Sequence, residues 1–139
     1  MDIDYQVMTI HDYEEALQLW RSCEGMGLSS ADGKQQIAAF LTRNPGLSLV
    51  AREPKKLVGT VLCGHDGRRG YLYHMAVDAA YRKLGVGKRL MEYALEGLKK
   101  AGIEKCHIFV YGENKEGLLF WEKTGWVLRD ELIILSKDI

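Results

Sequence analysis

Residues 81–91 read YRKLGVGKRLM, with Gly85 and Gly87 one residue apart and a pair of basic residues on either side. An apolar run at helical spacing begins at Leu90 and predicts a helix that starts near Lys88. Glycine lets the backbone turn tightly and leaves its amides open, and the first N–H groups of a helix have no partner within the helix. Because the helix dipole adds positive charge at the same place, the segment predicts a site for a ligand with more than one phosphate group.

Two common phosphate-binding sequences do not fit this segment. A P-loop requires Gly-x-x-x-x-Gly-Lys-Ser/Thr, but Arg82 stands five residues before Gly87, and Arg89 follows Lys88. A dinucleotide-binding fingerprint requires a third glycine where this chain has Leu90, and a parallel doubly wound sheet around it. A plain helix start with solvated basic side chains is the simpler alternative for a lone Gly-x-Gly.

The rest of the chain predicts a mixed α/β (α+β) fold around this segment. Strands are expected at residues 4–9, 47–52, 56–63, 71–77, 105–111 and 127–135, and helices at residues 12–20, 30–43, 88–101 and 114–122. Asp12 is expected to cap the first helix, with Glu15 as its capping-box partner, and Ser30 to cap the second. The strand, loop, helix and strand around Gly85 form a crossover, which predicts that its two strands pair in parallel.

Composition limits the class of protein. A chain of 139 residues is long enough for one domain, expected over residues 1–139. The 19 basic and 19 acidic residues balance, so we expect no nucleic acid and no membrane as a partner. Three widely spaced cysteines argue against a disulfide framework or a zinc site, and the acidic N-terminus is unlike a signal peptide. These features predict a cytoplasmic protein without a bound metal.

Three segments together resemble the GNAT acetyltransferase superfamily. Arg82-Lys-Leu-Gly85-Val-Gly87 is similar to the Arg/Gln-x-x-Gly-x-Gly/Ala signature of that family, and residues 74–78, HMAVD, are similar to the strand that enters it. Residues 114–126 resemble the family's Asn helix and its Tyr-Glu-Lys-x-Gly-Phe turn. The likeness extends over nearly the whole chain. It includes small bacterial acetyltransferases of undefined acceptor and, more distantly, the ribosomal-protein alanine N-acetyltransferases.

The resemblance implies a fold and a cofactor. The implied GNAT fold has a central mixed, mostly antiparallel twisted sheet of about seven strands with a V-shaped splay, flanked by four helices. The implied acetyl donor is acetyl coenzyme A, whose pantetheine lies in the splay and whose pyrophosphate lies on the glycine loop. The residues implied to bind it are Met75, Ala76, Val77, Arg82, Lys83, Leu84, Gly85, Val86, Gly87, Lys88, Asn114, Gly117 and Trp121.

The catalytic residues implied by the family are partly absent. The usual acid is a tyrosine seven residues after the asparagine, but this chain has Trp121 there, and an indole N–H does not give up its proton at neutral pH. Carboxylate bases of the family fall at Tyr71 or Phe109, and neither is acidic here. The candidates that remain are His74 as base and Glu113 as a base acting through a water. The phenols of Tyr73, Tyr81 and Tyr111 are the candidates for the acid. A core histidine and a solvated loop charge are the alternatives for His74 and Glu113.

The acceptor is expected to be a primary amine of a small molecule or a peptide. The loop at residues 23–30 offers Glu24, Met26 and Leu28 to face it. Because an α-amine has a pKa of about 7.7 to 8.0 and a lysine about 10.4, a site without a carboxylate base fits a protein N-terminal α-amine as an alternative acceptor. The rival function is a non-catalytic acyl-coenzyme A sensor. The oligomeric state is expected to be a monomer or a homodimer.

Overall fold

The computed structural model describes residues 2–139, which group into two compact units. The first unit extends to Phe109, and the second contains residues 110–139. The expected single domain over residues 1–139 stays a prediction.

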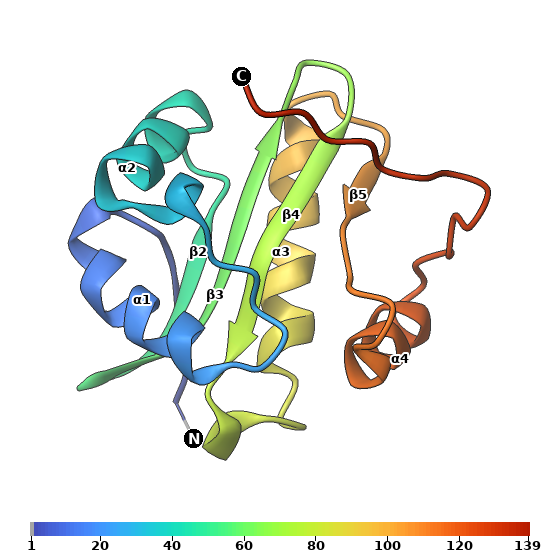
Figure 1. The fold of residues 1–139 in the computed structure, drawn as a ribbon. Helices are drawn as coiled ribbons and strands as arrows, with labels where there is room; N and C mark the ends of the chain where they lie inside the picture. Colours follow the sequence, from blue (N-terminus) through green and yellow to red (C-terminus); the bar gives the residue numbers. More distant parts are fainter. Residues whose placement is uncertain (1) are drawn as a thin grey trace. The chain divides into compact units, whose positions relative to one another are not determined.

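A five-stranded mixed sheet forms the centre of the first unit (Figure 1). Its strands are β1 (Asp4–Val7), β2 (Leu49–Glu53), β3 (Lys56–His65), β4 (Gly70–Val77) and β5 (Cys106–Ile108), and they lie side by side in chain order. The first three pairings are antiparallel, and β5 pairs with β4 in parallel. The parallel pairing predicted from the crossover is therefore confirmed.

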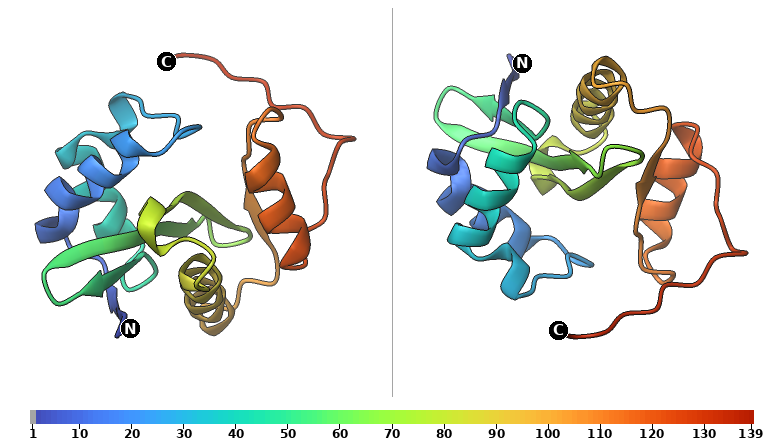
Figure 2. Two further views of the ribbon diagram at one scale, coloured as in Figure 1. Left: turned by 90° about the horizontal axis from the view of Figure 1, so that it is seen from below. Right: turned by 90° about the horizontal axis from the view of Figure 1, so that it is seen from above.

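Helices cover both faces of this sheet, with α1 (Tyr13–Ser22) and α2 (Lys34–Arg43) on one face and α3 (Val86–Lys100) on the other (Figure 2). The indole of Trp20 in α1 donates to the Thr60 hydroxyl, while the Cys63 thiol contacts the Ala94 carbonyl in α3. Successive strand residues point to opposite faces, so these contacts from one strand identify two layers of core. A Cβ on Gly70 would lie 2.6 Å from the Leu98 side chain, which shows how closely α3 approaches the sheet.

Short 3-10 turns precede three of the helices. They are η1 (Ile10–Asp12), η2 (Ser30–Asp32) and η3 (Ala79–Tyr81), which lie before α1, α2 and α3 respectively. The helix α3 ends in a Schellman arrangement, because Gly102 has a φ of +84° and the Ile103 amide donates to the Leu98 carbonyl. The predicted helix end at Gly102 is confirmed.

The predicted caps of the first two helices are wrong. The capping boxes instead begin at Thr9, three residues before Asp12, and at Ser29, one residue before Ser30; they join Thr9 to Asp12 at η1 and Ser29 to Asp32 at η2. Asp12 makes no side-chain cap for α1, and Glu15 instead accepts hydrogen bonds from Arg52 and from the Leu57 amide. Each carboxylate is already engaged by the 3-10 turn or by the sheet, so it is not available to the helix that follows.

The second unit consists of α4 (Lys115–Lys123) and the irregular segments before and after it. The Trp121 ring packs edge-on against Phe120 and Trp126, with ring centroids 4.9 Å and 5.0 Å apart.

In residues 2–139, none of the helices combines the length and the apolarity that a bilayer crossing requires.

The prediction of about seven strands is wrong for residues 2–139, which form five. Residues 127–135 were expected to be a strand, but they form no strand: Asp130 and Glu131 lie in a turn in which the Leu132 amide donates to the Arg129 carbonyl, and Val127 and Leu135 are exposed. A strand needs a second strand to satisfy its backbone, and the residues 129–131, Arg-Asp-Glu, divide the apolar run into two short pieces. β5 is also shorter than the expected residues 105–111.

Candidate active site

β5 pairs with only three residues of β4, which leaves an open edge along the rest of β4. The pairing joins Gly70 to Cys106 and ends where Leu72 faces Ile108. Beyond that point, within residues 2–139, no residue of β4 pairs with β5, while Tyr73, Ala76 and Val77 still pair with β3. Met75 and Val77 are half-buried there, whereas the Ala76 side chain is buried in the core, so Ala76 offers only its backbone to a ligand.

A β-bulge places His74 at the start of this open edge. The register of β4 against β3 shifts between the pairs Thr60–Ala76 and Leu62–Tyr73. His74 has a φ of +48°, a left-handed conformation that is uncommon for residues other than glycine. The Thr60 hydroxyl, 2.8 Å away, donates to the His74 carbonyl oxygen and supports this conformation. Strained backbone of this kind is concentrated at functional sites in proteins.

The His74 ring is held on two sides by side chains from the first part of the chain. Its Nε2 lies 2.6 Å from Oδ1 of Asp32, and its ring centroid lies 4.8 Å from that of Trp20. The His74 and Asp32 side chains are only 13% and 11% exposed. Asp32 was not predicted as a site residue. Its spacing from Ser29 predicts a capping box, but the contact with a histidine 42 residues later has no signal in the sequence.

The loop before α3 has the geometry of an anion site. Lys83 and Gly85 have φ values of +63° and +84°, and the first amide of α3 with an acceptor is that of Arg89, which donates to Gly85. Within residues 2–139, no acceptor is present for the amides of Val86, Gly87 and Lys88. These three donors at a helix N-terminus fit a pyrophosphate.

The two glycines of the loop have different roles. Gly85 adopts the left-handed backbone conformation of the turn. A Cβ at this position would meet nothing within 4 Å, so it is the positive φ, and not lack of space, that favours glycine. Gly87 lies in the first turn of α3, which starts at Val86 and therefore two residues earlier than predicted. The Val86 side chain is buried, so only its backbone amide can face a ligand.

Four exposed cations surround these amides, and they are Arg82, Lys83, Lys88 and Arg89. Arg82 is positioned by its Nε, which donates to the Val77 carbonyl, and its Nη2 lies 3.8 Å from the Cys23 sulfur. Lys83 and Lys88 make no hydrogen bond or ion pair within residues 2–139, so their charges are free for a ligand. Leu84 is exposed between them.

A row of aromatic side chains continues from the open edge toward the start of β4. The Tyr71 ring is stacked against those of Tyr73 and Phe109, at centroid distances of 6.4 Å and 6.1 Å. Tyr73 also packs edge-on against Phe40 of α2. Burial raises the pKa of Tyr73, so this phenol holds its proton firmly. A cavity of about 260 Å³ adjoins the row, lined by Phe40, Arg43, Asn44, Gly64, His65, Asp66, Tyr71 and Tyr73.

The loop expected to face the acceptor is only partly free to do so. Glu24 and Leu28 are exposed, but Met26 packs against the core cluster that contains Trp20. The phenol of Tyr81 has a hydrogen-bond partner of its own. It donates to the Glu53 carboxylate at 2.6 Å, and this bond raises the pKa of Tyr81.

In the second unit, Asn114 caps α4. Its Oδ1 accepts from the Gly117 amide at 3.0 Å, and a Cβ on Gly117 would lie 2.6 Å from the Asn114 amide nitrogen. Gly117 is therefore explained by the room that the cap needs. Trp121 is buried, whereas Glu113 and Tyr111 are exposed beside the cap.

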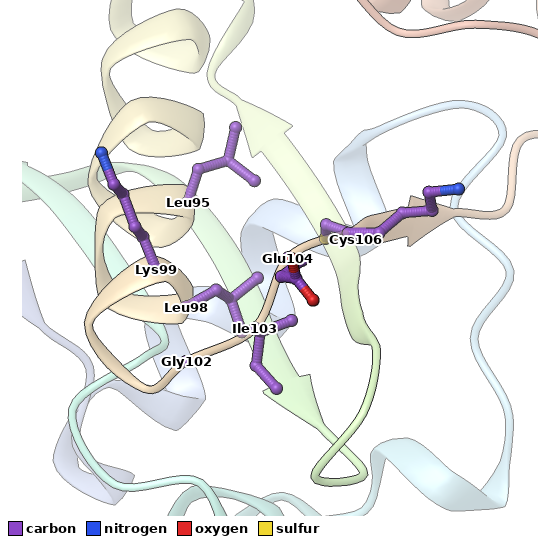
Figure 3. Close-up of a pocket in the computed structure, with 8 residues that line it drawn as sticks. Leu95, Leu98, Lys99, Gly102, Ile103, Glu104 and Cys106 are labelled. Atoms are coloured by element: carbon purple, nitrogen blue, oxygen red, sulfur yellow. The ribbon is translucent and has the colours of Figure 1, made fainter.

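A second cavity lies under the C-terminal half of α3 (Figure 3). Its volume is about 530 Å³, and it is lined by Leu95, Leu98, Lys99, Gly102, Ile103, Glu104, Lys105 and Cys106. Twelve helical residues separate Leu98 from Val86, which corresponds to roughly 18 Å along the helix axis. This cavity is thus separate from the glycine loop and the first turn of α3, which carry the four cations. Among residues 2–139 no group of three or more His, Cys, Asp or Glu side chains could hold a metal ion.

Comparison with known proteins identifies the family. Residues 13–126 match the model of the acetyltransferase (GNAT) family, and the chain belongs to this family. It is 30% identical over 138 residues to an acetyltransferase of Photorhabdus laumondii, an alignment that covers 99% of this chain and 96% of that protein. The predicted resemblance is confirmed, and the protein is an acetyltransferase whose acetyl donor is acetyl coenzyme A.

Solved structures agree with the fold. The PaiA N-acetyltransferase of Thermoplasma acidophilum in complex with coenzyme A is similar with a TM-score of 0.80 and 22% identity, over 94% of this chain and 92% of that chain. The ribosomal-protein-S18-alanine N-acetyltransferase of Escherichia coli gives a TM-score of 0.73 and 18% identity, over 89% of this chain and 77% of that chain. At these identities the likeness establishes the fold alone.

Proposed function

We propose that this acetyltransferase moves the acetyl group of acetyl coenzyme A directly to a primary amine, at the open edge of β4. The observation that carries the proposal is the end of the β4–β5 pairing at Leu72, followed along β4 by the cationic loop before α3. An extended pantetheine can pair with the backbone of Met75 and Val77 in that opening, as the family resemblance implies. Asn114 and Trp121 are proposed to contact the same cofactor from α4.

The amides of Val86, Gly87 and Lys88 are proposed to hold the pyrophosphate. Arg82, Lys83 and Lys88 add charge-assisted hydrogen bonds, and the Ala76 and Leu84 backbones line the path. The bound cofactor supplies a thioester carbonyl that an amine can attack. The protein then has to remove a proton from the acceptor ammonium and to supply one to the departing thiolate.

His74 is proposed as the group that takes the ammonium proton. It is the titratable side chain at the start of the open edge, and its ring is fixed by Asp32 and Trp20. Glu113 and Tyr111 remain proposals for a water-mediated base and for the acid. Trp121 is proposed to pack against the cofactor, since it cannot serve as the acid.

The acceptor is proposed to lie on the α1 and α2 side of the sheet. Glu24 and Leu28 of the loop before η2 are exposed there, and the rings of Tyr71, Tyr73 and Phe109 offer an apolar surface. Small-molecule amines, peptides and protein N-terminal α-amines all fit this description. The monomeric or homodimeric state and the cytoplasmic location stay predictions.

The test is the release of free thiol from acetyl coenzyme A in the presence of a panel of amines that includes peptides with free N-termini. Turnover with at least one amine supports the proposal. Tight binding of acetyl coenzyme A without turnover on any amine would favour the sensor function instead. A Gly87→Val variant should stay folded by circular dichroism and lose most of its coenzyme A affinity, and unchanged affinity would contradict the proposed pyrophosphate site.

A further inference from the structure

We propose that Asp32 is a positioning residue for His74, and that the two form a carboxylate–imidazole pair which presents the Nδ1 lone pair of His74 to the acceptor ammonium. This inference rests on the proposed function. It adds a residue from the 3-10 turn before α2 to a site otherwise built from β4 and the glycine loop. Its basis is the 2.6 Å contact between His74 Nε2 and Asp32 Oδ1.

The surroundings of Asp32 fix the direction of its carboxylate. Oδ2 accepts from the Ser29 amide at 2.9 Å, and Oδ1 is left for the histidine. The Asp32 carbonyl accepts from the Tyr13 hydroxyl at 2.6 Å, which ties the turn to α1. With both oxygens engaged and the side chain only 11% exposed, the carboxylate has one orientation toward β4.

This contact determines which ring nitrogen can accept a proton. A carboxylate accepts hydrogen bonds, so Nε2 is the nitrogen that carries the hydrogen, and Nδ1 keeps its lone pair. Among residues 2–139 no buried side-chain nitrogen or oxygen lacks a partner. Since Nδ1 has no hydrogen-bond partner in this described part of the chain, the atom is open to solvent.

The proton balance of the step is complete. One N–H bond of the acceptor ammonium breaks, and the proton forms a new bond to Nδ1 of His74. The amine becomes neutral, the imidazole becomes a cation, and the negative charge of Asp32 compensates it at 2.6 Å. The proton then passes from Nδ1 to solvent, which returns the pair to its starting state.

The backbone supports this arrangement rather than a purely structural ion pair. A histidine that only linked η2 to the sheet would not require a left-handed residue inside a strand, yet His74 has a φ of +48°. At this bulge the His74 ring contacts Trp20 and Asp32, and the Thr60 hydroxyl donates to the His74 carbonyl.

The protein offers a matched control in Asp12. Asp12 is also the last residue of a capping box, with Thr9, and its side chain is 12% exposed. It pairs with Arg52 at 2.6 Å instead of with a histidine. An Asp12→Asn change therefore removes an equally buried carboxylate in the same local geometry, away from the open edge.

The kinetic experiment compares Asp32→Asn, His74→Asn and the double variant, using the full chain and an amine accepted by the wild type. Asparagine suits position 74 because it tolerates left-handed backbone. His74→Asn should lower kcat by about 100-fold, and Asp32→Asn by at least ~10-fold, with KM for acetyl coenzyme A changed less than about twofold. The double variant should be no slower than His74→Asn, because the two residues act as a unit. Asp12→Asn should keep wild-type kcat while lowering thermal stability.

A readout independent of activity is the ¹⁵N spectrum of the histidine rings in the unliganded protein. The wild type should show His74 with a protonated Nε2 and an unprotonated Nδ1, and Asp32→Asn should alter this pattern while Asp12→Asn should not. The inference would be overturned if the His74 ring were protonated on Nδ1. It would also be overturned if Asp32→Asn kept wild-type kcat while His74→Asn was impaired. Either result would leave the acetyl transfer proposal intact. Absence of turnover in the wild type would instead refute the proposed function.

Discussion

Trp20 and Thr60, one in α1 and one in β3, form a buried hydrogen bond of 2.9 Å in which the indole N–H donates to the hydroxyl oxygen. Both side chains are fully inaccessible to solvent. The same hydroxyl donates to the His74 carbonyl, so one threonine joins α1 to the bulge of β4. The chain order of these residues gives no indication of this connection.

Thr60→Val should destabilise the fold by about 1–3 kcal/mol, because it leaves the buried indole N–H of Trp20 without an acceptor. Urea unfolding with an unchanged m-value would measure the loss. Thr60→Ser is the control, since it keeps both hydrogen bonds and loses one methyl group worth about 0.8 kcal/mol. A Thr60→Val protein as stable as Thr60→Ser would show that the bond is dispensable.

Lys83→Gly should separate stability from affinity. The left-handed backbone at φ +63° is strained for lysine and free for glycine, so stability should be unchanged or higher by up to about 1 kcal/mol. Loss of the free cation should weaken coenzyme A binding about fivefold, or ~1 kcal/mol, with the difference shrinking at high salt.

Calorimetric titration with coenzyme A measures this affinity. Lys99→Ala is the control, because it removes an equal charge near the far end of the same helix. Equal losses of affinity in both variants would mean that net charge, and not the loop, holds the ligand.

The sequence contained enough information for the helix after the glycine loop and for the crossover. Glycine spacing, basic residues and a long amphipathic helix are local signals, and the structure confirms α3 and the parallel pairing of β4 with β5. The start of α3 was misplaced by two residues because Gly87 was interpreted as part of the turn, whereas the positive φ belongs to Gly85.

Contacts between distant segments could not be predicted. The cap assigned to Glu15 is locally reasonable, but Arg52 competes for the carboxylate from β2. Asp32 has the spacing of a capping residue, and its second role depends on how the bulge turns His74. A strand at residues 127–135 was expected from composition, but strand formation depends on a paired partner that composition does not specify.

Glu15 predicts an acid dependence of stability. Arg52 donates a hydrogen bond of 2.8 Å, which lowers the pKa of Glu15 below its ordinary value of 4.5. A carboxyl group with a lower pKa in the folded state stabilises the fold above its unfolded pKa and loses that effect as pH falls through the folded pKa. The melting temperature of wild type should therefore exceed that of Glu15→Gln at pH 7, and the gap should close as pH falls below about 4.5.

The corresponding difference in the free energy of unfolding at pH 7 should be small, about 0.5 kcal/mol, because the Glu15 side chain is 45% exposed. Glu96 is exposed and has no partner among residues 2–139, so Glu96→Gln is the control. The melting temperature of this variant should equal that of wild type at both pH values. A difference that widens in acid would contradict the assignment.

The thiols should differ in reactivity. Burial raises the pKa of Cys63 and of Cys106 to about 12, so neither forms much thiolate at pH 8. Iodoacetamide at pH 8, followed by peptide mass mapping, should modify Cys23 first and the other two only after urea is added. Labelling of Cys63 at the rate of Cys23 in the native protein would show that the core opens readily.

The parallel register of β5 has a consequence for the order of folding. Cys106 pairs with Gly70, 36 residues earlier in the chain, and the pairing covers only three residues of each strand. The antiparallel β2–β3 and β3–β4 pairs are connected by short turns and can form early, whereas β5 has to wait until α3 has brought the chain across the sheet. In native-state hydrogen exchange, the amides of β5 should therefore open with a lower free energy than those of β3, so the opening beside β4 can widen without unfolding the rest of the first unit.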